Sequence, residues 1–285
     1  MQRAPSRPLL AGVLNVTPDS FSDGGRFLAR EAAIEHGLAL AAAGADWIDV
    51  GGESTRPGAE RVPAAVQRER VLPVIEGLRA RLELPISVDT TLAAVAGPAL
   101  DAGATVVNDV SAGREDPELV ELVAARGAGL VLMHMRGTPA DMQRDPRYDD
   151  VLGEVRAFLG ERLAACRAAG VAAERLWVDP GIGFGKTLEH NLALLRGLAQ
   201  LADLGAPLFV GVSRKSFLEA VRRAEGLGPG ADAERLGGTL AALLFCARAG
   251  VAVLRVHDVA RAAEALAVQR ALEGARDTAQ NRPPR

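Results

Sequence analysis

The feature that most restricts the fold of this sequence is a repeated alternation of short apolar runs with longer amphipathic stretches. Eight apolar runs have the length of β-strands, at residues 10–14, 47–50, 86–88, 105–107, 129–133, 176–178, 208–212 and 251–256. The stretches between them are rich in alanine, leucine and arginine and have helical periodicity. This alternation predicts repeated strand–helix units with a parallel sheet.

Eight predicted helices follow these strands, at residues 29–43, 64–81, 91–102, 117–125, 150–169, 190–201, 235–248 and 259–272. An open doubly wound sheet usually has fewer strands and a glycine-rich fingerprint in its first turn, which this chain lacks. We therefore expect an α/β protein, a single (β/α)8 TIM barrel over residues 1–272 without a linker. Residues 273–285 lack apolar periodicity, so we expect a frayed C-terminal tail.

The composition excludes several classes of partner. Hydrophobic residues make up 48% and charged residues 24% of the 285 residues, so one large core is feasible. The formal net charge is -3 with both signs interspersed, and no basic field attracts nucleic acid or an anionic membrane. No run of about 18 apolar residues occurs, and Cys166 and Cys246 lie in separate segments. We expect no nucleic-acid or membrane partner and a reduced, soluble, cytoplasmic protein.

Polar or glycine-rich residues follow every predicted strand. They are Asn15, the segment 51–56, Asp89, Asn108 with Asp109, His134, the segment 179–181, the segment 213–215, and Arg255 with His257. In a (β/α)8 barrel the active site forms at the carboxyl ends of the strands. We therefore expect these residues to share one pocket.

Asp89, Asn108 and Asp179 are expected to point into this pocket. Carboxylate oxygens accept paired hydrogen bonds from adjacent N–H donors, which suits a flat heterocycle with an amidine-like edge. A metal site is one alternative, and oxygen ligation by Asn15 together with ligand phosphates fits Mg²⁺ better than a cage of protein ligands. A structural cap or ion pair is the other alternative, and Asp179 precedes a proline, which by itself ends a strand.

The segment 51–58, GGESTRPG, and the end of the eighth strand have the composition of an anion-binding site. They supply backbone N–H groups, the hydroxyl of Thr55 and the side chains of Arg56, Arg255 and His257. Arg255 and His257 are two residues apart and therefore lie on the same side of the strand. A surface salt bridge is the alternative for Arg56.

Only two of the 33 basic residues are lysines, Lys186 and Lys215. A lysine supplies a compact ammonium with a mobile proton, which a guanidinium does not. Lys215 follows the seventh strand and is the better candidate for contact with a reacting ring. Lys186 ends a GFGK segment without the full spacing of a phosphate-binding loop, so we reject nucleoside triphosphate binding. His134, at an apolar strand end, is as often packed as catalytic.

Two long loops follow the first two strands. Residues 16–27, VTPDSFSDGGRF, have neither helical nor strand periodicity. Such a loop over a barrel mouth usually works as a lid, and an ordinary connection is the alternative. Residues 53–62 carry the expected anion ligands. We expect both loops to close over bound ligand.

Seven motifs, in this order, resemble those of the dihydropteroate synthase family of pterin-binding TIM barrels. They are GVLNVTPDSFSDGG (12–25), IDVGGESTRPGA (48–59), SVDT (87–90), LMHMRGTPADMQ (132–143), DPGIGFGK (179–186), GVSRKSF (211–217) and RVHDV (255–259). The resemblance covers residues 9–272. It implies a homodimeric enzyme of folate biosynthesis, in the class that sulfonamides inhibit.

The resemblance also implies the reaction. Mg²⁺-bound pyrophosphate would leave 6-hydroxymethyl-7,8-dihydropterin pyrophosphate, and the amine of p-aminobenzoate would then attack to give 7,8-dihydropteroate. This is the transfer of an alkyl group. Two alternatives remain, a corrinoid-type pterin methyltransferase barrel, which needs no diphosphate clamp, and a catalytically silent pterin-binding paralogue.

Roles for individual residues follow from the resemblance in the same way. Asn15 would hold the Mg²⁺. The diphosphate would be bound by Thr55, Arg56, Arg255 and His257. The pterin pocket would be lined by Asp89, Asn108, Asp179 and Lys215. The p-aminobenzoate site would be shaped by Phe21, Pro57, Phe184 and Ser213. The catalytic residues would be Lys215, Arg255, His257 and Asp23.

Overall fold

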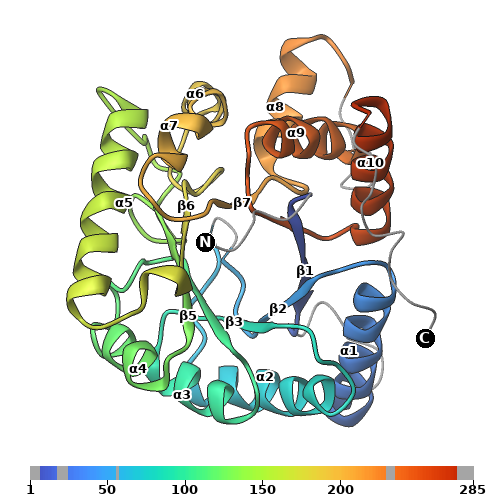
Figure 1. Ribbon diagram of the computed structural model, residues 1–285, viewed down its shortest axis with the longest axis vertical. Coiled ribbons are helices and arrows are strands. Elements are labelled where there is room, and N and C mark those ends of the chain that lie inside the picture. The colour runs from blue at the N-terminus through green and yellow to red at the C-terminus, as the bar shows by residue number, and fades with distance from the viewer. Residues whose placement is uncertain (1–6, 18–24, 56–57, 229–234, 275–285) are drawn as a thin grey trace.

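Eight parallel strands form a closed barrel in the computed structural model, which describes residues 7–17, 25–55, 58–228 and 235–274. The strands pair in the order β6-β5-β4-β3-β2-β1-β8-β7, and a parallel bridge between Val178 and Leu208 joins β6 to the start of β7. Figure 1 shows the helices arranged in a ring around these strands. The predicted (β/α)8 fold is confirmed.

The strands are β1 (Leu9–Asn15), β2 (Trp47–Gly51), β3 (Ile86–Asp89), β4 (Val106–Asp109), β5 (Gly129–Met133), β6 (Leu176–Asp179), β7 (Phe209–Gly211) and β8 (Val253–Val256). The helices are α1 (Gly25–Ala42), α2 (Ala64–Arg79), α3 (Ala93–Asp101), α4 (Glu118–Arg126), α5 (Val151–Ala168), α6 (Leu188–Arg196), α7 (Leu198–Ala202), α8 (Ser216–Ala224), α9 (Leu236–Arg248) and α10 (Val259–Leu272), with a short 3-10 helix at Ala173–Arg175.

Two helix predictions need correction. The helix predicted at 190–201 is two helices, α6 and α7, which meet at Gly197. A Cβ at Gly197 would lie 2.5 Å from a methyl group of Leu152 of α5, so any larger residue there requires Leu152 to move. Helix α8 was not predicted, because the prediction placed one helix in the unit after β7, at residues 235–248, and that unit contains two.

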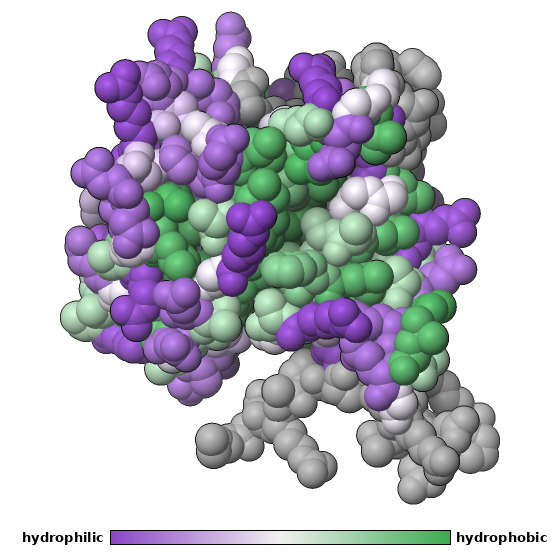
Figure 2. All heavy atoms as spheres, turned by 90° about the horizontal axis from the view of Figure 1, so that it is seen from above, coloured by the Kyte–Doolittle hydropathy of each residue, from purple (hydrophilic) through white to green (hydrophobic). Residues whose placement is uncertain are grey.

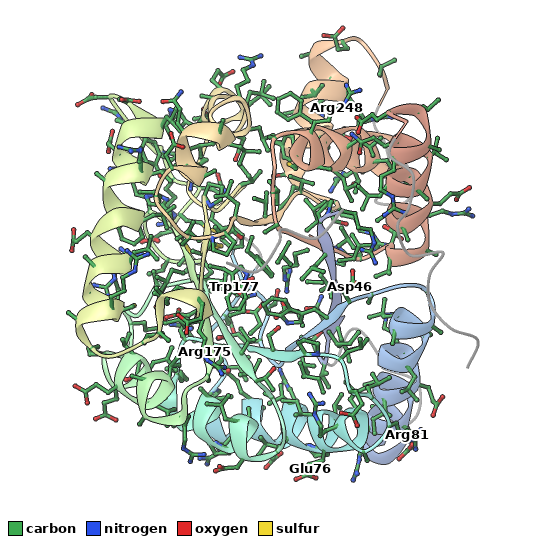
Figure 3. The ribbon with its side chains drawn as sticks, in the orientation of Figure 1. Asp46, Glu76, Arg81, Arg175, Trp177 and Arg248 are labelled. Carbon is green, nitrogen blue, oxygen red and sulfur yellow. The ribbon has the colours of Figure 1, made fainter. Side chains whose placement is uncertain are left out.

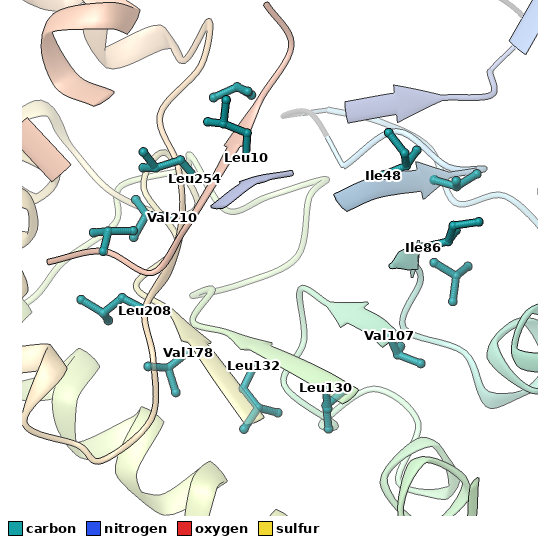
Figure 4. Packing of buried hydrophobic residues seen from close by; sticks show 14 of the residues in the cluster. Leu10, Ile48, Ile86, Val107, Leu130, Leu132, Val178, Leu208, Val210 and Leu254 are labelled. Atoms are coloured by element: carbon teal, nitrogen blue, oxygen red, sulfur yellow. The ribbon is translucent and has the colours of Figure 1, made fainter. Parts of the chain in front are cut away.

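The hydrophobic core has two main parts, on the two faces of the barrel wall, and a small third cluster of Val110, Met133, Met135 and Met142 beside Phe184. The larger part lies between strands and helices, and Figure 4 shows its strand residues around the outside of the barrel. The smaller part lies inside, where Trp47 stacks edge-on against Trp177 at 5.4 Å and against Phe209 at 5.5 Å. Figure 3 shows Trp177 inside the ring of strands and Glu76 of α2 on the outer surface.

The inward-facing side chains change character along each strand. In β2 the inward series is Trp47, Asp49 and Gly51, because successive side chains of a strand point to opposite faces. In β6, Trp177 and Asp179 follow the same order from apolar to polar. Aromatic rings therefore fill the amino-terminal end of the barrel, and polar groups collect at the carboxyl end.

Every helix in the described part of the chain is too short or too polar to cross a lipid bilayer. Cys166 and Cys246 are separate buried thiols, as predicted. Of the predicted tail, residues 275–285 lie outside the described residues.

Candidate active site

A cavity opens at the carboxyl ends of the strands. It is lined by Thr55, Asp89, Asn108, Val110, Met133, Asp179, Phe184, Gly211, Ser213, Lys215, Arg255 and His257. Nine of the proposed site residues therefore line one cavity. They are Thr55, Asp89, Asn108, Asp179, Phe184, Ser213, Lys215, Arg255 and His257.

Asp49 is the centre of a buried hydrogen-bond network beneath this cavity. Its Oδ1 accepts from the hydroxyl of Ser87, which in turn accepts from Trp47 Nε1 at 2.7 Å. Its Oδ2 accepts from Asn108 Nδ2 at 3.2 Å and from Arg255 Nε at 2.6 Å. The network orients two cavity side chains. Sequence analysis missed Asp49, although a carboxylate within an apolar strand was an available signal.

Arg255 is held between two carboxylates at the wall of the cavity. Besides its bond to Asp49, it donates through Nη2 to Asp89 Oδ2 at 3.0 Å. Burial works against the charge of the guanidinium, but Asp49 and Asp89 outweigh this effect and raise the pKa of Arg255 above its ordinary value. A guanidinium has five N–H donors, and these bonds use two of them. Arg255 is therefore a fixed cation with further donors for an anionic ligand.

Asp89 carries a perturbed carboxyl group. Burial and the nearby charge of Asp49 together raise its pKa to about 7, and the charge of Arg255 opposes both. Both protonation states are therefore populated near neutral pH. Because the side chain lines the cavity, a ligand with N–H donors that binds the carboxylate will draw Asp89 into its ionised form.

Lys215 lies between a carboxylate and an aromatic ring. Burial lowers the pKa of Lys215 to about 8, and Asp179 opposes the shift. Its Nζ lies 4.0 Å from the centroid of the Phe184 ring, a cation–π contact. Burial raises the pKa of Asp179 to about 6. The backbone N–H of Gly181 donates to Asp179 Oδ1 at 2.7 Å and opposes this rise. The chain thus places an ammonium on a ring face and within electrostatic reach of a carboxyl group.

Ser213 and His257 are joined across β7 and β8. His257 Nδ1 lies 3.0 Å from Ser213 Oγ, and the backbone N–H of His257 donates to the same oxygen at 3.3 Å. The two predicted functions, diphosphate binding for His257 and p-aminobenzoate binding for Ser213, therefore meet at one point of the cavity wall.

The side chain of Glu53 holds the loop after β2 in place through hydrogen bonds within the loop. Its carboxylate accepts from the backbone N–H of Val62 at 2.7 Å and from Arg61 Nη1 at 3.1 Å. Arg61 also pairs with Glu115 from the loop after β4. Thr55, two residues after Glu53, lines the cavity. Four proposed site residues, Phe21, Asp23, Arg56 and Pro57, lie outside the described residues.

Two strand-end residues are directed away from the cavity. Asp109 is fully buried and accepts from the backbone N–H groups of Ser111 at 2.7 Å and Gly113 at 2.5 Å, so it shapes its own loop. His134 packs edge-on against Phe158 at 4.9 Å and contacts Lys186. These contacts agree with the packed alternative for His134.

Asn15 stands at the end of β1, next to the cavity. It pairs in register with Gly51, which in turn pairs with Asp89. A Cβ placed on Gly51 would lie 3.6 Å from Asn15 Oδ1 and 3.6 Å from Asp89 Cβ. Gly51 has no side chain. The amide oxygen of Asn15 and the side chain of Asp89 therefore lie on either side of the Gly51 backbone at the mouth of the barrel.

Comparison with known proteins agrees with this geometry. The pterin binding enzyme family matches residues 11–257. The dihydropteroate synthase of Escherichia coli (strain K12) is 44% identical over 272 residues, 95% of this chain and 94% of that protein. A solved structure of Xanthomonas albilineans dihydropteroate synthase with 4-aminobenzoic acid is 47% identical, covers 94% of each chain and has a TM-score of 0.86.

A further solved structure is the Xanthomonas albilineans dihydropteroate synthase in complex with 7,8-dihydropteroate, at 43% identity and a TM-score of 0.82 over 94% of each chain. These similarities run through the whole barrel rather than through one motif, and they include the strands that build the cavity. The chain therefore belongs to the dihydropteroate synthases, a family of pterin-binding transferases.

Proposed function

We propose that this enzyme condenses 6-hydroxymethyl-7,8-dihydropterin pyrophosphate with p-aminobenzoate to give 7,8-dihydropteroate and pyrophosphate. The observation that carries the proposal is the composition of a single cavity, which offers carboxyl acceptors on one part of its wall and cationic donors on another. Relatives solved with 4-aminobenzoic acid and with 7,8-dihydropteroate support the two halves of this substrate assignment.

The pterin would bind among Asp89, Asn108, Asp179 and Lys215. A pterin ring presents adjacent N–H donors on one edge, and carboxylates accept such a pair well. Asn108 supplies both an acceptor and donors, and its amide is already oriented by Asp49 at 3.2 Å. A fixed wall of this kind lowers the entropy cost of placing the ring for reaction.

The diphosphate would bind beside Arg255, His257 and Thr55, with Arg56 as a further ligand from the loop after β2. Arg255 is held rigidly by two carboxylates, so its remaining donors are preorganised for a phosphate oxygen. The hydrogen bond to Ser213 orients the ring of His257. These donors would stabilise the negative charge that grows on the leaving group.

Mg²⁺ is the cofactor that we propose for the diphosphate. The described residues contain no group of three or more His, Cys, Asp or Glu side chains able to hold a metal ion by protein ligands alone. Asn15 offers one amide oxygen, and a single protein oxygen completed by diphosphate oxygens and water suits Mg²⁺. When bound, the ion would neutralise part of the charge on the departing pyrophosphate.

The proposed reaction is a substitution at the exocyclic carbon of the pterin. The C–O bond to pyrophosphate breaks first, and its electron pair leaves with the oxygen, which produces a pterin-stabilised cation. The nitrogen lone pair of p-aminobenzoate then forms the new C–N bond, and the nitrogen loses one proton to water. Because the arylamine is neutral near pH 7, no strong general base is required.

The walls of the p-aminobenzoate site would protect the cation from water. Phe184 and Ser213 line the cavity, and the proposed lid residues Phe21 and Asp23 together with Pro57 would complete the enclosure. Water that reached the cation would give an unproductive alcohol. We therefore assign Asp23 a catalytic role through closure of the loop after β1.

The test is the formation of dihydropteroate and pyrophosphate by the purified protein with both substrates and Mg²⁺, followed by chromatography. We expect product only when both substrates are present, and a loss of at least about 100-fold in kcat/KM for Lys215→Ala and Arg255→Ala. Binding of the pterin without product would favour a silent paralogue. Methyl transfer to a corrinoid protein would favour the methyltransferase alternative.

We also propose that two copies of the chain associate through the last helices, in the cytoplasm. Phe245 of α9 is 48% exposed, and Val268 and Leu272 of α10 are 54% and 83% exposed. Figure 2 views the molecule from the side of α6 to α10, and hydrophobic residues gather across the middle of the visible surface. Light scattering should give the mass of a dimer, and Phe245→Glu should shift it toward the monomer.

A further inference from the structure

Lys186 and His134 form a buried pair that the proposed reaction does not use. Lys186 is 3% exposed and His134 is 6% exposed. Lys186 Nζ lies 3.0 Å from His134 Nδ1, 2.9 Å from the carbonyl oxygen of Phe184 and 3.4 Å from the carbonyl oxygen of His134. An ammonium has three N–H donors, so these three acceptors match it. Burial, and then the charge of Lys186, lowers the pKa of His134 to about 3, which leaves the imidazole a neutral acceptor.

The pair connects two loops at the mouth of the barrel. His134 begins the loop after β5, and Lys186 lies near the end of the loop between β6 and α6. The second loop contains three glycines with positive φ, at 68° for Gly181, 83° for Gly183 and 62° for Gly185. A segment with alternating left-handed glycines has little conformational preference of its own. Besides the internal bond from the backbone N–H of Phe184 to the carbonyl oxygen of Gly181 at 3.0 Å, bonds from neighbouring segments therefore set its shape.

Side chains of the loop after β5 supply two more of these bonds. Gln143 Nε2 donates to the carbonyl oxygen of Gly183 at 2.7 Å, and the hydroxyl of Tyr148 donates to that of Gly185 at 2.9 Å. Gln143 is exposed and Tyr148 is half-buried. Lys186 differs from both because it is enclosed, and burial lowers its pKa to about 7, so its ammonium form is populated at neutral pH and below. A hydrogen bond from a charged donor that is shielded from water is stronger than the bonds from the neutral donors of Gln143 and Tyr148.

Phe184 links this cluster to the substrate cavity. Its carbonyl oxygen accepts from Lys186, and its ring lies 4.0 Å from Nζ of Lys215. One residue is thus held at its backbone by one of the two lysines of the chain and contacts the other through its side chain. A displacement of the backbone at residue 184 moves the ring relative to Lys215.

We propose that Lys186 is a positioning residue for the arylamine substrate. By holding the carbonyl group of Phe184 and drawing the loop against His134, it fixes the Phe184 ring beside Lys215. It thereby sets the affinity for p-aminobenzoate without contacting either substrate. This inference rests on the proposed function, because it takes Phe184 as a wall of the p-aminobenzoate site.

The first test is Lys186→Met, which keeps the length of the side chain and removes the ammonium. We expect the KM for p-aminobenzoate to rise about tenfold, because a charge-assisted buried hydrogen bond is lost, while the KM for the pterin pyrophosphate changes less than about twofold. The matched control is Leu78→Ala. Leu78 is a fully buried residue of α2 that packs near Gly37 of α1, so the substitution leaves a cavity in the core. It should lower the melting temperature and leave both KM values unchanged.

The second test is a double-mutant cycle with Phe184→Leu. If Lys186 acts through Phe184, adding Lys186→Met to Phe184→Leu raises the KM for p-aminobenzoate no further than Phe184→Leu alone. A purely structural role predicts equal effects in both backgrounds. Additive effects, or a parallel rise of both KM values, overturn the proposal.

A third variant covers the case in which Lys186→Met does not fold. His134→Leu removes one of the three acceptors and leaves Lys186 in place, and it is judged by the same comparison of the two KM values. Failure of the inference is distinguishable from failure of the proposed function, since the wild-type protein is assayed in parallel. A wild type that forms no dihydropteroate rejects the function, whereas an active wild type with an unchanged KM in both variants rejects the role of Lys186.

Discussion

Arg255 Nε donates to Asp49 Oδ2 at 2.6 Å inside the barrel, although the two residues come from opposite ends of the chain. Asp49 is fully buried, whereas the side chain of Arg255 is 21% exposed and reaches the cavity. Asp49 itself is absent from the cavity wall that the described residues form. Its contribution to function therefore acts through the side chains that it orients, Arg255 above all.

Replacement of Asp49 by asparagine tests this relationship. Asp49→Asn keeps the shape but leaves Arg255 without its closest buried counter-charge, so we expect the free energy of unfolding to fall by about 3 kcal/mol. We expect kcat/KM for the pterin pyrophosphate to fall about 100-fold, because Arg255 loses its fixed orientation. Chemical denaturation and steady-state kinetics measure the two effects. Asp101→Asn, which breaks an exposed ion pair with Arg126, serves as the control and should change neither.

The raised pKa of Asp89 predicts how pterin binding depends on pH. Asp89 titrates near 7 in the folded protein, and its ordinary value is 3.8. Only the carboxylate accepts two N–H donors, so the affinity for an unphosphorylated pterin should rise about tenfold per pH unit below 7 and level off above it. Calorimetric titration across this range measures the curve. An identical curve for Asp89→Asn would show that another group is responsible.

The raised pKa of Asp89 makes the stability of the folded protein fall with rising pH, whereas pterin binding should rise. For a carboxyl group whose pKa is raised on folding, the stabilisation is fully present below the unfolded value of 3.8 and is lost as the pH rises through about 7. Asp89 therefore makes the empty protein less stable at the pH where we expect it to bind pterin best. In the Asp49→Asn variant the pKa of Asp89 should fall, and the midpoint of pterin binding should move to lower pH.

The barrel and most of its cavity could be predicted from the sequence because two independent signals coincided. Short apolar runs marked the strands, and a polar residue such as Asp89 or Asp179 marked the carboxyl end of each. Since all parallel strands of a closed barrel end on the same side, a linear list of strand ends already describes a site. The motifs then narrowed the chemistry to a pterin diphosphate.

The residues that sequence analysis missed or left open act through partners distant in the chain. Asp49 meets Ser87, Asn108 and Arg255 only after β2, β3, β4 and β8 converge. Lys186 was noticed for its rarity, but its role depends on His134, 52 residues away. Hydrophobic periodicity reports which face of an element is buried and gives no information on which polar groups pair across the barrel.

Removal of Mg²⁺ tests the proposed metal ligand. Chelation should abolish product formation, and added Mg²⁺ should restore it, because the charge of the leaving group is then neutralised. Asn15→Ala should raise the Mg²⁺ concentration needed for half-maximal activity about tenfold and should leave the affinity for unphosphorylated pterin unchanged. An unaltered Mg²⁺ requirement in Asn15→Ala would remove this residue from the metal site.

Gly181 offers a last test, of the local backbone that carries Asp179. It has a φ of 68°, and a Cβ there would lie 1.9 Å from the carbonyl oxygen of His134, so Gly181→Ala must displace the loop after β6. Gly205 is the matched control, with a φ of 73° and open space around it. Gly205→Ala should lower the free energy of unfolding by about 1 kcal/mol from backbone strain alone, and Gly181→Ala should lower it by at least about 2 kcal/mol more from the clash.

Because the backbone N–H of Gly181 also donates to Asp179, only Gly181→Ala should weaken pterin binding. Equal losses of stability in the two variants would show that the loop relaxes freely, and would argue against a rigid connection between β6 and the loop after β5.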